Sequence, residues 1–596
     1  MRAFYLKDML QFFKYVLATI VGLLLFMTLG FILLLGIAAA TTDDTVSIEK
    51  DSVLELKLNQ PILERSPRSP FADLGFSDAF GDGGIGLDDI KASIRKAKND
   101  DNINGIMLNL EFMQVGMASL EEIRDELIEF KKSKKFVVAY SEIATEKAYY
   151  LSSVADRIYL NPSGTLELNG LSSEVLFFKG SLEKLDIEPY IFKVGEYKSA
   201  VEPFILDKMS EPSRAQTTSF LNSLNNFMLQ NLAKARNKSF AEVKNISDSM
   251  LVHNAEDALK YGLVTHLGYY DEVLAFMKRK TGIEADEEVN LVNLSKYRKV
   301  ADEHKKTGSS KNKIAVIYAS GEIVGGKGDE DNIGGEGMSE AIRKARLDKN
   351  VKAVVLRINS PGGSSLASDV IWREVMLTKK VKPVIASMSD VAASGGYYIA
   401  MACDTIVAHP NTITGSIGVF GMIFNGENFL KNKLGITVDR VKTGKFSDVP
   451  SVTRQMTEYE KMHVQREVER IYTDFTTKAA KSRNMSVEAL RKVASGRVWS
   501  GSEAKARGLV DVFGGLDEAI AIAAKKAKLK KDEYRVRTMP EQKSFMSNFL
   551  EESESQIKSY YLQKELGTMM PYYQQYKKLE MMQGVQARMP YDLAIQ

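Results

Sequence analysis

The sequence predicts an α/β fold made of two copies of one domain, preceded by one N-terminal transmembrane helix. In each copy, short apolar runs typical of strands alternate with amphipathic segments typical of helices, and this alternation indicates parallel strands. The copies keep one register, because residues 92–98 and 340–346, and likewise Tyr149 and Tyr397, are 248 positions apart. Matches that keep their order over roughly 190 residues indicate a duplicated domain.

Each copy contains the same elements in the same order. Three helix and strand pairs come first, and a helix, a glycine turn, a strand and a helix close the copy. The predicted strands are 105–110, 136–141 and 157–162 in the first copy and 353–358, 383–389 and 405–410 in the second.

The chain divides into seven predicted segments. Residues 276–312 are dense in Lys and Glu, as expected of a linker, and the region after 530 is rich in Met, Tyr and Gln. We expect this last region to form a packing or oligomer surface and assign it no chemistry. The segments are a cytoplasmic N-terminus (1–14), a transmembrane signal anchor (15–42), an extracytoplasmic lead-in (43–85), a first repeat (86–275), a linker (276–312), a second repeat (313–530) and a C-terminal tail (531–596).

The anchor is predicted from the segment between Lys14 and Asp43, where 28 residues carry no charge and most are apolar. About 20 apolar residues suffice to cross a bilayer. Basic residues precede the segment and acidic residues follow it, so the N-terminus is expected in the cytoplasm and the body outside. The alternative is a cleaved signal peptide ending near Ala38–Ala40, but its apolar core would be only roughly 7 to 15 residues long.

Composition narrows the possible functions. The formal net charge of +3 over 596 residues gives no reason to expect a nucleic-acid partner. The single cysteine, Cys403, excludes an internal disulfide and lies in an apolar stretch where a buried thiol is expected. No group of His, Cys and carboxylate residues has metal-ligand spacing, so no metal and no cofactor are expected.

The two copies differ where chemistry could reside. The second copy has Ser394 in AASGGYY, where the first has Glu146, and the first has Lys198 in GEYKSAVEPF, where the second has Ser447. A serine kept only in one copy and a lysine kept only in the other predict a Ser/Lys pair assembled between them. The pair could form within a chain or between subunits, and we favour one chain because the duplication places both halves on it.

Ser394 is expected at a helix N-terminus, where backbone N–H groups can stabilise developing negative charge. The turn NSPGGSS adds Gly362 and Gly363, whose amides could form an oxyanion hole with that of Gly395. Two alternatives remain open at this point. Ser394 could only cap the helix, and the glycine turn could only reverse the chain.

A nucleophilic serine needs a base, and the five histidines do not provide one. None lies in a repeat-specific catalytic context, which argues against a Ser/His/Asp triad, and His409 replaces Asn161 of the first copy in a loop. A lysine can act as the base when burial lowers its pKa from about 10.4 towards neutrality. Lys198 is therefore the candidate base, and Ser416 in TGSIG could orient its amine.

At these residues the chain closely resembles the long form of signal peptide peptidase A, or protease IV, a family of membrane-anchored bacterial serine peptidases. The motifs that carry the resemblance are VGEYKSAVEPF, INSPGGS, AASGGYY and NTITGSIGVFG, within residues 50–525. The resemblance implies tandem Clp-protease/crotonase-like domains, with Lys198 as general base, Ser394 as nucleophile, Ser416 orienting the lysine, and Gly362 and Gly363 in the oxyanion turn.

The resemblance also implies where the protein acts and on what. It implies a homo-tetramer in the bacterial inner membrane, with the catalytic body on the periplasmic side. Its substrates would be signal peptides and other membrane-associated peptides. Two other functions stay open: a crotonase-like enzyme acting on acyl-CoA, disfavoured by the extracytoplasmic location, and a non-catalytic membrane scaffold, disfavoured by the retained Ser394 and Lys198.

Overall fold

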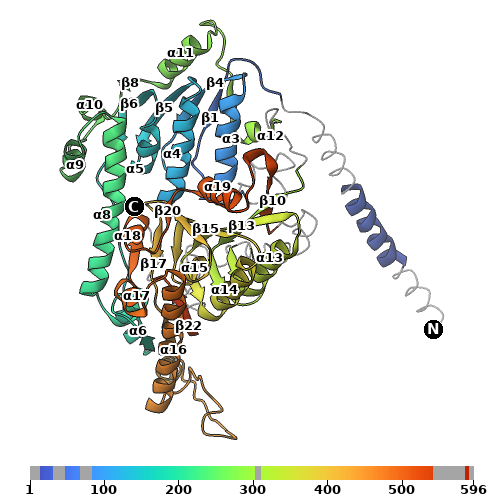
Figure 1. Ribbon diagram of the computed structural model, residues 1–596, viewed down its shortest axis with the longest axis vertical. Helices are drawn as coiled ribbons and strands as arrows, with labels where there is room; N and C mark the ends of the chain where they lie inside the picture. The colour runs from blue at the N-terminus through green and yellow to red at the C-terminus, as the bar shows by residue number, and fades with distance from the viewer. Residues whose placement is uncertain are drawn as a thin grey trace, which may run out of the picture.

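The computed structural model describes residues 14–30, 47–66, 84–301, 310–329, 331–540 and 584–589. Two α/β repeats lie one above the other, each with a sheet flanked by helices (Figure 1). Three large sheets organise the described chain: one in each repeat and a third to which both repeats contribute. A short pairing of β2 (Ile62–Leu63) with β3 (Ile85–Gly86) adds to the first repeat.

The sheet of the first repeat is parallel throughout, in the order β8-β6-β5-β4-β1-β9. Apolar clusters bury both of its faces, as is typical of parallel strands covered by helices. Its strands are β1 (Ser52–Leu56), β4 (Ile103–Asn109), β5 (Phe136–Ala144), β6 (Arg157–Leu166), β8 (His266–Leu267) and β9 (Leu291–Asn293). The helices of this repeat are α3 (Leu87–Asn99), α4 (Met117–Lys131), α5 (Glu146–Ser152), α6 (Lys179–Lys184), α7 (Glu202–Ile205), α8 (Glu211–Ala235), α9 (Phe240–Asp248), α10 (Ala255–Lys260), α11 (Tyr270–Thr281) and α12 (Leu294–Lys299).

The sheet of the second repeat has the order β19-β17-β15-β13-β10-β21, and β16 and β20 continue it from β15. All its pairings are parallel except that of β17 with β19. Its strands are β10 (Lys313–Ser320), β13 (Val351–Ser360), β15 (Val384–Ala393), β16 (Thr405–Ala408), β17 (Ile413–Gly415), β19 (Val498–Ser500), β20 (Val512–Phe513) and β21 (Arg535–Met539). Its helices are α13 (Gly335–Leu347), α14 (Ser365–Lys379), α15 (Gly395–Ala400), α16 (Glu458–Ser482), α17 (Val487–Val493), α18 (Gly501–Ala506) and α19 (Leu516–Lys526).

The elements of the two repeats keep the register that the sequence predicts. Helices α3 and α13 begin at Leu87 and Gly335, and strands β4 and β13 begin at Ile103 and Val351. The predicted tandem α/β architecture is therefore confirmed. Each sheet also includes strands from outside the predicted repeat ranges, because β1, β9 and β21 come from the predicted lead-in, linker and tail.

The third sheet joins the repeats in the order β12-β11-β14-β22-β18-β7. From the first repeat comes β7 (Glu188–Lys193), which pairs antiparallel with β18 (Phe420–Asn425) of the second. The glycine turn continues into β14 (Gly362–Ser364), and the tail supplies β22 (Gly584–Arg588). The other two strands are β11 (Glu322–Val324) and β12 (Asn332–Gly334). This sheet brings the segment after β7, which carries Lys198, against the second repeat.

Helix α8 packs on both repeats and runs along one side of the molecule (Figure 1). Its Phe220 and Leu224 pack with Ala393 of the second repeat, whereas its Met228 and Leu229 belong to the core of the first. Helix α8 is 25 residues long and therefore holds the two repeats against each other, because one part of it packs on each repeat.

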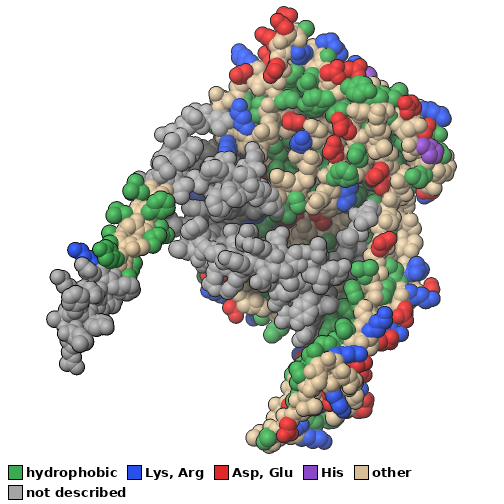
Figure 2. All heavy atoms as spheres, turned by 180° about the vertical axis from the view of Figure 1, so that it is seen from behind, with side chains coloured by type: hydrophobic (Ala, Val, Ile, Leu, Met, Phe, Trp, Pro, Cys, Tyr) green, Lys and Arg blue, Asp and Glu red, His purple; other side chains and the backbone are tan. Residues whose placement is uncertain are grey.

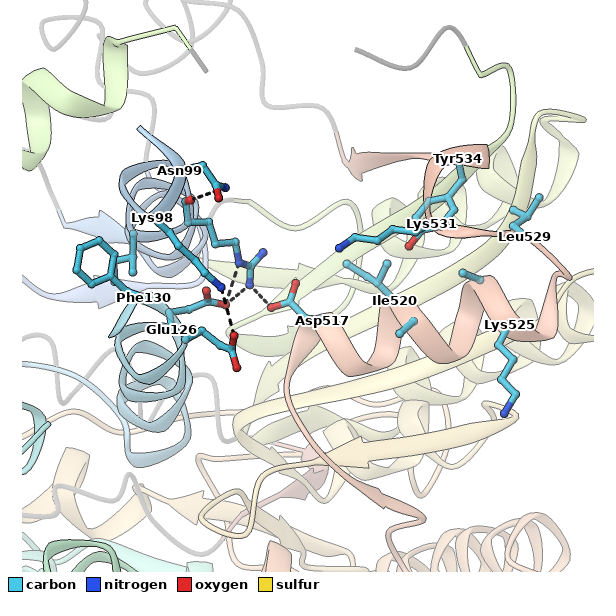
Figure 3. A pocket seen from close by; sticks show the side chains of 15 residues that line it. Lys98, Asn99, Glu126, Phe130, Asp517, Ile520, Lys525, Leu529, Lys531 and Tyr534 are labelled. Carbon is cyan, nitrogen blue, oxygen red and sulfur yellow. Dashed lines mark hydrogen bonds and ion pairs between the residues drawn. The ribbon is translucent and has the colours of Figure 1, made fainter. Parts of the chain in front are cut away.

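Buried charges form a second contact between the repeats. Arg357 of β13 pairs with Glu64 at 2.7 Å and with Glu122 of α4 at 2.8 Å, and all three side chains are buried. Closer to the surface, Arg95 of α3 contacts Asp517 of α19 (Figure 3). Removing one partner of a buried ion pair costs about 3–5 kcal/mol, so this cluster fixes the arrangement of the two repeats.

The apolar N-terminal segment is helical over residues 14–30, and this helix lies apart from the body (Figure 1). Its apolar side chains are exposed. Among the residues that the structure describes, no helix is both long and apolar enough to cross a membrane. Residues 31–42 of the predicted anchor lie outside the described residues, so the transmembrane helix stays a prediction.

Candidate active site

Three polar side chains meet in the interior between the two repeats. Lys198 Nζ lies 2.8 Å from Ser394 Oγ and 3.0 Å from Ser416 Oγ, and it donates to the Ser416 carbonyl at 3.2 Å. All three residues are fully buried. The structure thus brings a lysine of the first repeat and a serine of the second into hydrogen-bond contact within one chain, across 196 positions of sequence.

The environment of Lys198 favours a neutral amine. Its three described hydrogen-bond partners are uncharged oxygens. Burial lowers the pKa of Lys198 well below its usual value, because desolvation penalises the charged form. A neutral amine at this distance can accept the proton of the Ser394 hydroxyl, which a charged ammonium cannot do.

Gln216 of α8 holds the backbone on both sides of Lys198. Its Nε2 donates to the Tyr197 carbonyl at 3.0 Å and to Ser199 Oγ at 2.9 Å, and its Oε1 accepts the Val498 N–H at 3.0 Å. Gln216 is fully buried. One side chain therefore connects the lysine segment to β19 of the second repeat.

A glycine of the second repeat makes room for the lysine segment. Gly496 has φ of 80°, and a Cβ there would lie 2.7 Å from both the nitrogen and the Cβ of Lys198. Such a contact is too short for carbon against backbone nitrogen, so a side chain at this position would push the lysine away from Ser394. Glycine is required here both for its backbone conformation and for the close approach.

Ser394 has a backbone conformation that is rare for a residue with a side chain, with φ of 55° and ψ of −110°. Its N–H donates to the Gly415 carbonyl at 2.9 Å, and its side chain makes no capping hydrogen bond to α15. Conformations of this kind cost about 1–3 kcal/mol and cluster at functional sites. The alternative that Ser394 only caps the helix is therefore wrong, since its hydroxyl is directed to Lys198.

The glycine turn lies next to the start of α15. Gly362 has φ of 101°, and a Cβ there would lie 2.7 Å from the Gly395 amide nitrogen. The Gly362 N–H itself donates to Ser360 Oγ at 3.2 Å. The Gly362 amide therefore already has an acceptor within the turn, and the oxyanion roles of Gly363 and Gly395 stay predictions.

Comparisons with known proteins point to one peptidase family. A model described as peptidase family S49 matches the chain twice, at residues 129–284, which contain Lys198, and at 376–530, which contain Ser394 and Ser416. The chain is 37% identical to Protease 4 of Haemophilus influenzae over 445 residues, 72% of this chain and 71% of that protein. The chain belongs to peptidase family S49. It is accordingly a serine peptidase.

Other relatives of this S49 chain cover similar lengths. Protease 4 of Salmonella typhi is 39% identical over 453 residues, 74% of this chain and 72% of that protein. The chloroplastic Serine protease SPPA of Arabidopsis thaliana is 37% identical over 75% of this chain, and the chain spans 66% of that relative. A solved structure, a ClpP1 mutant from Listeria monocytogenes, matches 34% of this chain and 94% of its own with a TM-score of 0.24 and 18% identity. That likeness is too weak to argue from, so the Clp-protease/crotonase-like character stays a prediction.

The first repeat has Glu146 where the second has Ser394, and the second has Ser447 where the first has Lys198. These two residues form no second Ser/Lys pair. Glu146 at the start of α5 accepts the Gly170 N–H at 3.0 Å, and burial raises the pKa of Glu146 to about 7. Ser447 is exposed in the loop between β18 and α16, where it donates to the Gly444 carbonyl. Within the described residues, this S49 peptidase has one Ser/Lys arrangement.

The remaining candidate groups lie away from the Ser/Lys pair. His409 is buried, which lowers the pKa of its ring to about 4, and its backbone N–H donates to Thr412 in a loop. Cys403 is buried, and burial raises the pKa of its thiol. The pocket between α3, α4 and α19 (Figure 3) contains none of the residues of the pair.

Sequence reasoning missed two parts of the site. Gln216 lies in a polar stretch of α8 where no spacing distinguishes it. The strand β22 has a weak signal, because Val585, Ala587 and Met589 are apolar at every second position, as in a half-buried strand. The tail around this stretch is too rich in Met, Tyr and Gln for that pattern to stand out.

Proposed function

We propose that this S49 peptidase is a membrane-anchored serine endopeptidase that uses a Ser394/Lys198 dyad to degrade cleaved signal peptides in or at the membrane. One observation carries the assignment of the dyad: the buried amine of Lys198 lies 2.8 Å from the hydroxyl of Ser394. Ser416 Oγ, 3.0 Å from the same amine, orients it.

The mechanism follows from the geometry. Neutral Lys198 takes the proton of the Ser394 hydroxyl as Oγ attacks a peptide carbonyl. The amides of Gly363 and Gly395, with a minor part for Gly362, stabilise the oxyanion. Lys198 then protonates the leaving amine, and a water deprotonated by Lys198 hydrolyses the acyl-enzyme. The residues of the chain suffice for these steps, and no metal or cofactor is included.

The substrate class is proposed from the names of relatives. Besides the proteins named Protease 4, a protein of Enterococcus faecium described as a putative signal peptide peptidase SppA is 34% identical over 238 residues, 39% of this chain and 68% of that protein. The central region of a signal peptide is apolar, and pairing with a sheet edge is a general way to hold an extended peptide.

The location is proposed as the bacterial inner membrane, with one membrane pass, the N-terminus inside and the catalytic body in the periplasm. The apolar helix 14–30 supports an anchor, since eleven of its large apolar side chains are exposed, and the helix stands apart from the body in Figure 2. On the face seen in Figure 2, Lys/Arg and Asp/Glu side chains are interspersed, which supports the absence of a nucleic-acid partner. A homo-oligomer of four chains belongs to the same proposal.

The decisive experiment compares wild type and Ser394→Ala in a peptidase assay with the detergent-solubilised full chain. Turnover of an unstructured apolar peptide should fall by about a thousandfold or more, because the nucleophile is lost. Ser447→Ala is the matched control, since this serine occupies the equivalent position to Lys198 but lies exposed in a loop. Normal turnover by folded Ser394→Ala would exclude the dyad, and tight binding of a CoA thioester would favour the acyl-CoA alternative.

A further inference from the structure

Helix α4 of the first repeat begins without a capping side chain from its own repeat. Its N-cap residue is Gly116, and its first turn contains no acidic residue. The equivalent helix of the second repeat, α14, begins after Ser364, whose Oγ accepts the Ala367 N–H at 3.3 Å. Gly116 and Ser364 are 248 positions apart, which is the offset of the two repeats. Because the first N–H groups of a helix have no partner within it, α4 needs an acceptor from elsewhere.

Asp390 of β15 in the second repeat provides this acceptor. Its Oδ1 accepts the N–H groups of Ala118 and Ser119 at 2.9 Å each, and its Oδ2 accepts the Ser119 hydroxyl at 2.6 Å. The Ser119 amide is the equivalent of the Ala367 amide that Ser364 binds in α14. An oxygen of the second repeat therefore caps a helix of the first, in the place of a local serine.

Gly116 leaves the space that this carboxyl group occupies. A Cβ at position 116 would lie 2.0 Å from Asp390 Cγ, and the next two atoms it would meet are the two carboxyl oxygens. The backbone of Gly116, with φ of −76° and ψ of 162°, is open to any residue. Glycine is therefore required here for the close approach of Asp390 and not for its backbone freedom.

Asp390 lies in a bulge of β15, shortly before the proposed nucleophile. Ile358 of β13 pairs with Met388 of β15, and Ser360 of β13 pairs with Ala392 of β15. One residue of β13 thus lies opposite three of β15, and Asp390 is the middle one of the three. Bulges of this kind bend a strand and are common beside active sites. Since these residues leave the regular ladder, their position depends on contacts outside the strand pair.

After the bulge, β15 leads directly to Ser394. Ala393 pairs with Gly415 of β17, and the Ser394 N–H donates to the Gly415 carbonyl at 2.9 Å. Asp390 precedes Ser394 by four residues, so a displacement of the bulge is passed along a short segment to the serine. The cap on α4 also ties this segment to the repeat that carries Lys198. The distance between hydroxyl and amine is therefore set in part by this cap.

We propose that Asp390 is a positioning residue for Ser394, which caps α4 of the first repeat and thereby holds the bulge of β15 in place. This inference rests on the proposed function, because it takes Ser394 as the nucleophile. Asp390 acts through the backbone of β15 rather than on the reacting atoms.

The test measures peptide turnover and thermal unfolding of variants of the detergent-solubilised full chain. Asp390→Ala should lower kcat by about 10- to 100-fold with little change in KM, because a small displacement of a catalytic group costs that much. It should also melt at a lower temperature, since α4 loses its cap. Gly116→Ala should lower kcat in the same way, because its Cβ displaces the carboxyl group.

Two further variants serve as controls. Asp390→Asn should keep most of the activity, because Oδ1 alone accepts both N–H groups and an amide oxygen can replace it. Glu142→Ala should change neither kcat nor the melting temperature. Glu142 occupies the equivalent position of the first repeat, where it is exposed and accepts a hydrogen bond from Tyr140.

A double variant separates positioning from helix stability. Asp390→Ala combined with Gly116→Ser gives α4 a serine cap like that of α14, and it removes the carboxyl group with which this serine would collide. The melting temperature should return towards that of wild type, whereas kcat should stay low. Recovery of kcat together with the melting temperature would overturn the positioning role, because a cap on α4 would then suffice.

A covalent fluorophosphonate probe gives a reading of the serine that needs no substrate. The rate at which it labels Ser394 should fall with kcat in Asp390→Ala, since the hydroxyl is no longer held beside its base. Equal labelling and equal kcat in an active wild type and Asp390→Ala would overturn the role of Asp390 alone. A folded wild type that neither turns over peptide nor reacts with the probe would overturn the dyad and this role together.

Discussion

Lys198, the proposed base, lowers the stability of the fold, because burial disfavours the charged form of its amine. In the folded chain its pKa is lowered by burial, whereas in the unfolded chain it titrates near the ordinary lysine value of about 10.4. Between these two pKa values the unfolded state binds more protons than the folded state, so stability rises with pH across this window. Near neutrality the lysine therefore destabilises the fold.

We expect Lys198→Met to be inactive and to melt at a higher temperature than wild type at pH 7. The gain should shrink as pH approaches 10.5, where the unfolded lysine also loses its proton. Lys198→Arg is the matched control and should be inactive and less stable, because a guanidinium stays charged when buried. Thermal unfolding of wild type and the two variants from pH 6 to 10.5 measures these differences in melting temperature. A lower melting temperature for Lys198→Met at pH 7 would contradict the neutral amine.

The activity of wild type should also depend on the ionisation of Lys198. Turnover is expected to fall as pH drops through the lowered pKa of Lys198, since the protonated amine cannot accept the serine proton. A rate profile of kcat/KM against pH measures this directly. A flat profile from acid to alkaline pH would mean that Lys198 is not the base.

Sequence reasoning could predict the chemistry of this site but not all of its geometry. Lys198 and Ser394 were predicted because the first copy lacks the serine and the second copy lacks the lysine. That argument needs no structure. For Ser416 the residues alone gave a weaker indication, a hydroxyl in TGSIG that could orient the amine, and the resemblance implied the same role. The direction of the Gly362 amide could not be predicted, because it depends on the two positive φ angles of the turn and on the rotamer of Ser360.

At the scale of secondary structure, α8 connects the lysine segment to the second repeat through one side chain. We expect Gln216→Ala to lower kcat by about 10- to 100-fold, because a small displacement of a catalytic group costs that much. The pH at which activity falls should also rise, since a loosened lysine is better hydrated. Gln230→Ala, on the exposed face of the same helix, should change neither kcat nor the pH profile. Unchanged kinetics in Gln216→Ala would show that Gln216 does not position Lys198.

The main strands were predictable from sequence, whereas the third sheet was not. Long apolar runs such as β13 and β15 carry a strong local signal. The strands β7, β14, β18 and β22 are short or rich in glycine and polar residues, and they pair over long stretches of sequence. Their conformation is decided by tertiary partners rather than by local preference.

At the scale of the whole molecule, the site needs both repeats but only one chain. Mixing a Ser394→Ala chain with a Lys198→Ala chain should therefore restore no activity in hybrid oligomers, since every chain lacks half of its pair. Wild type mixed with Ser394→Ala is the control and should lose activity in proportion to dilution. Substantial rescue would mean that Lys198 reaches the serine of a neighbouring subunit.

Because Lys198 precedes Ser394 in the sequence, the ribosome adds the serine some time after the lysine. The 196 positions between Lys198 and Ser394 take on the order of 10–40 s to translate at about 5–20 residues per second. During this time the first repeat can fold without the serine. A nascent chain of this peptidase thus lacks its proposed nucleophile until the second half has been made and has docked.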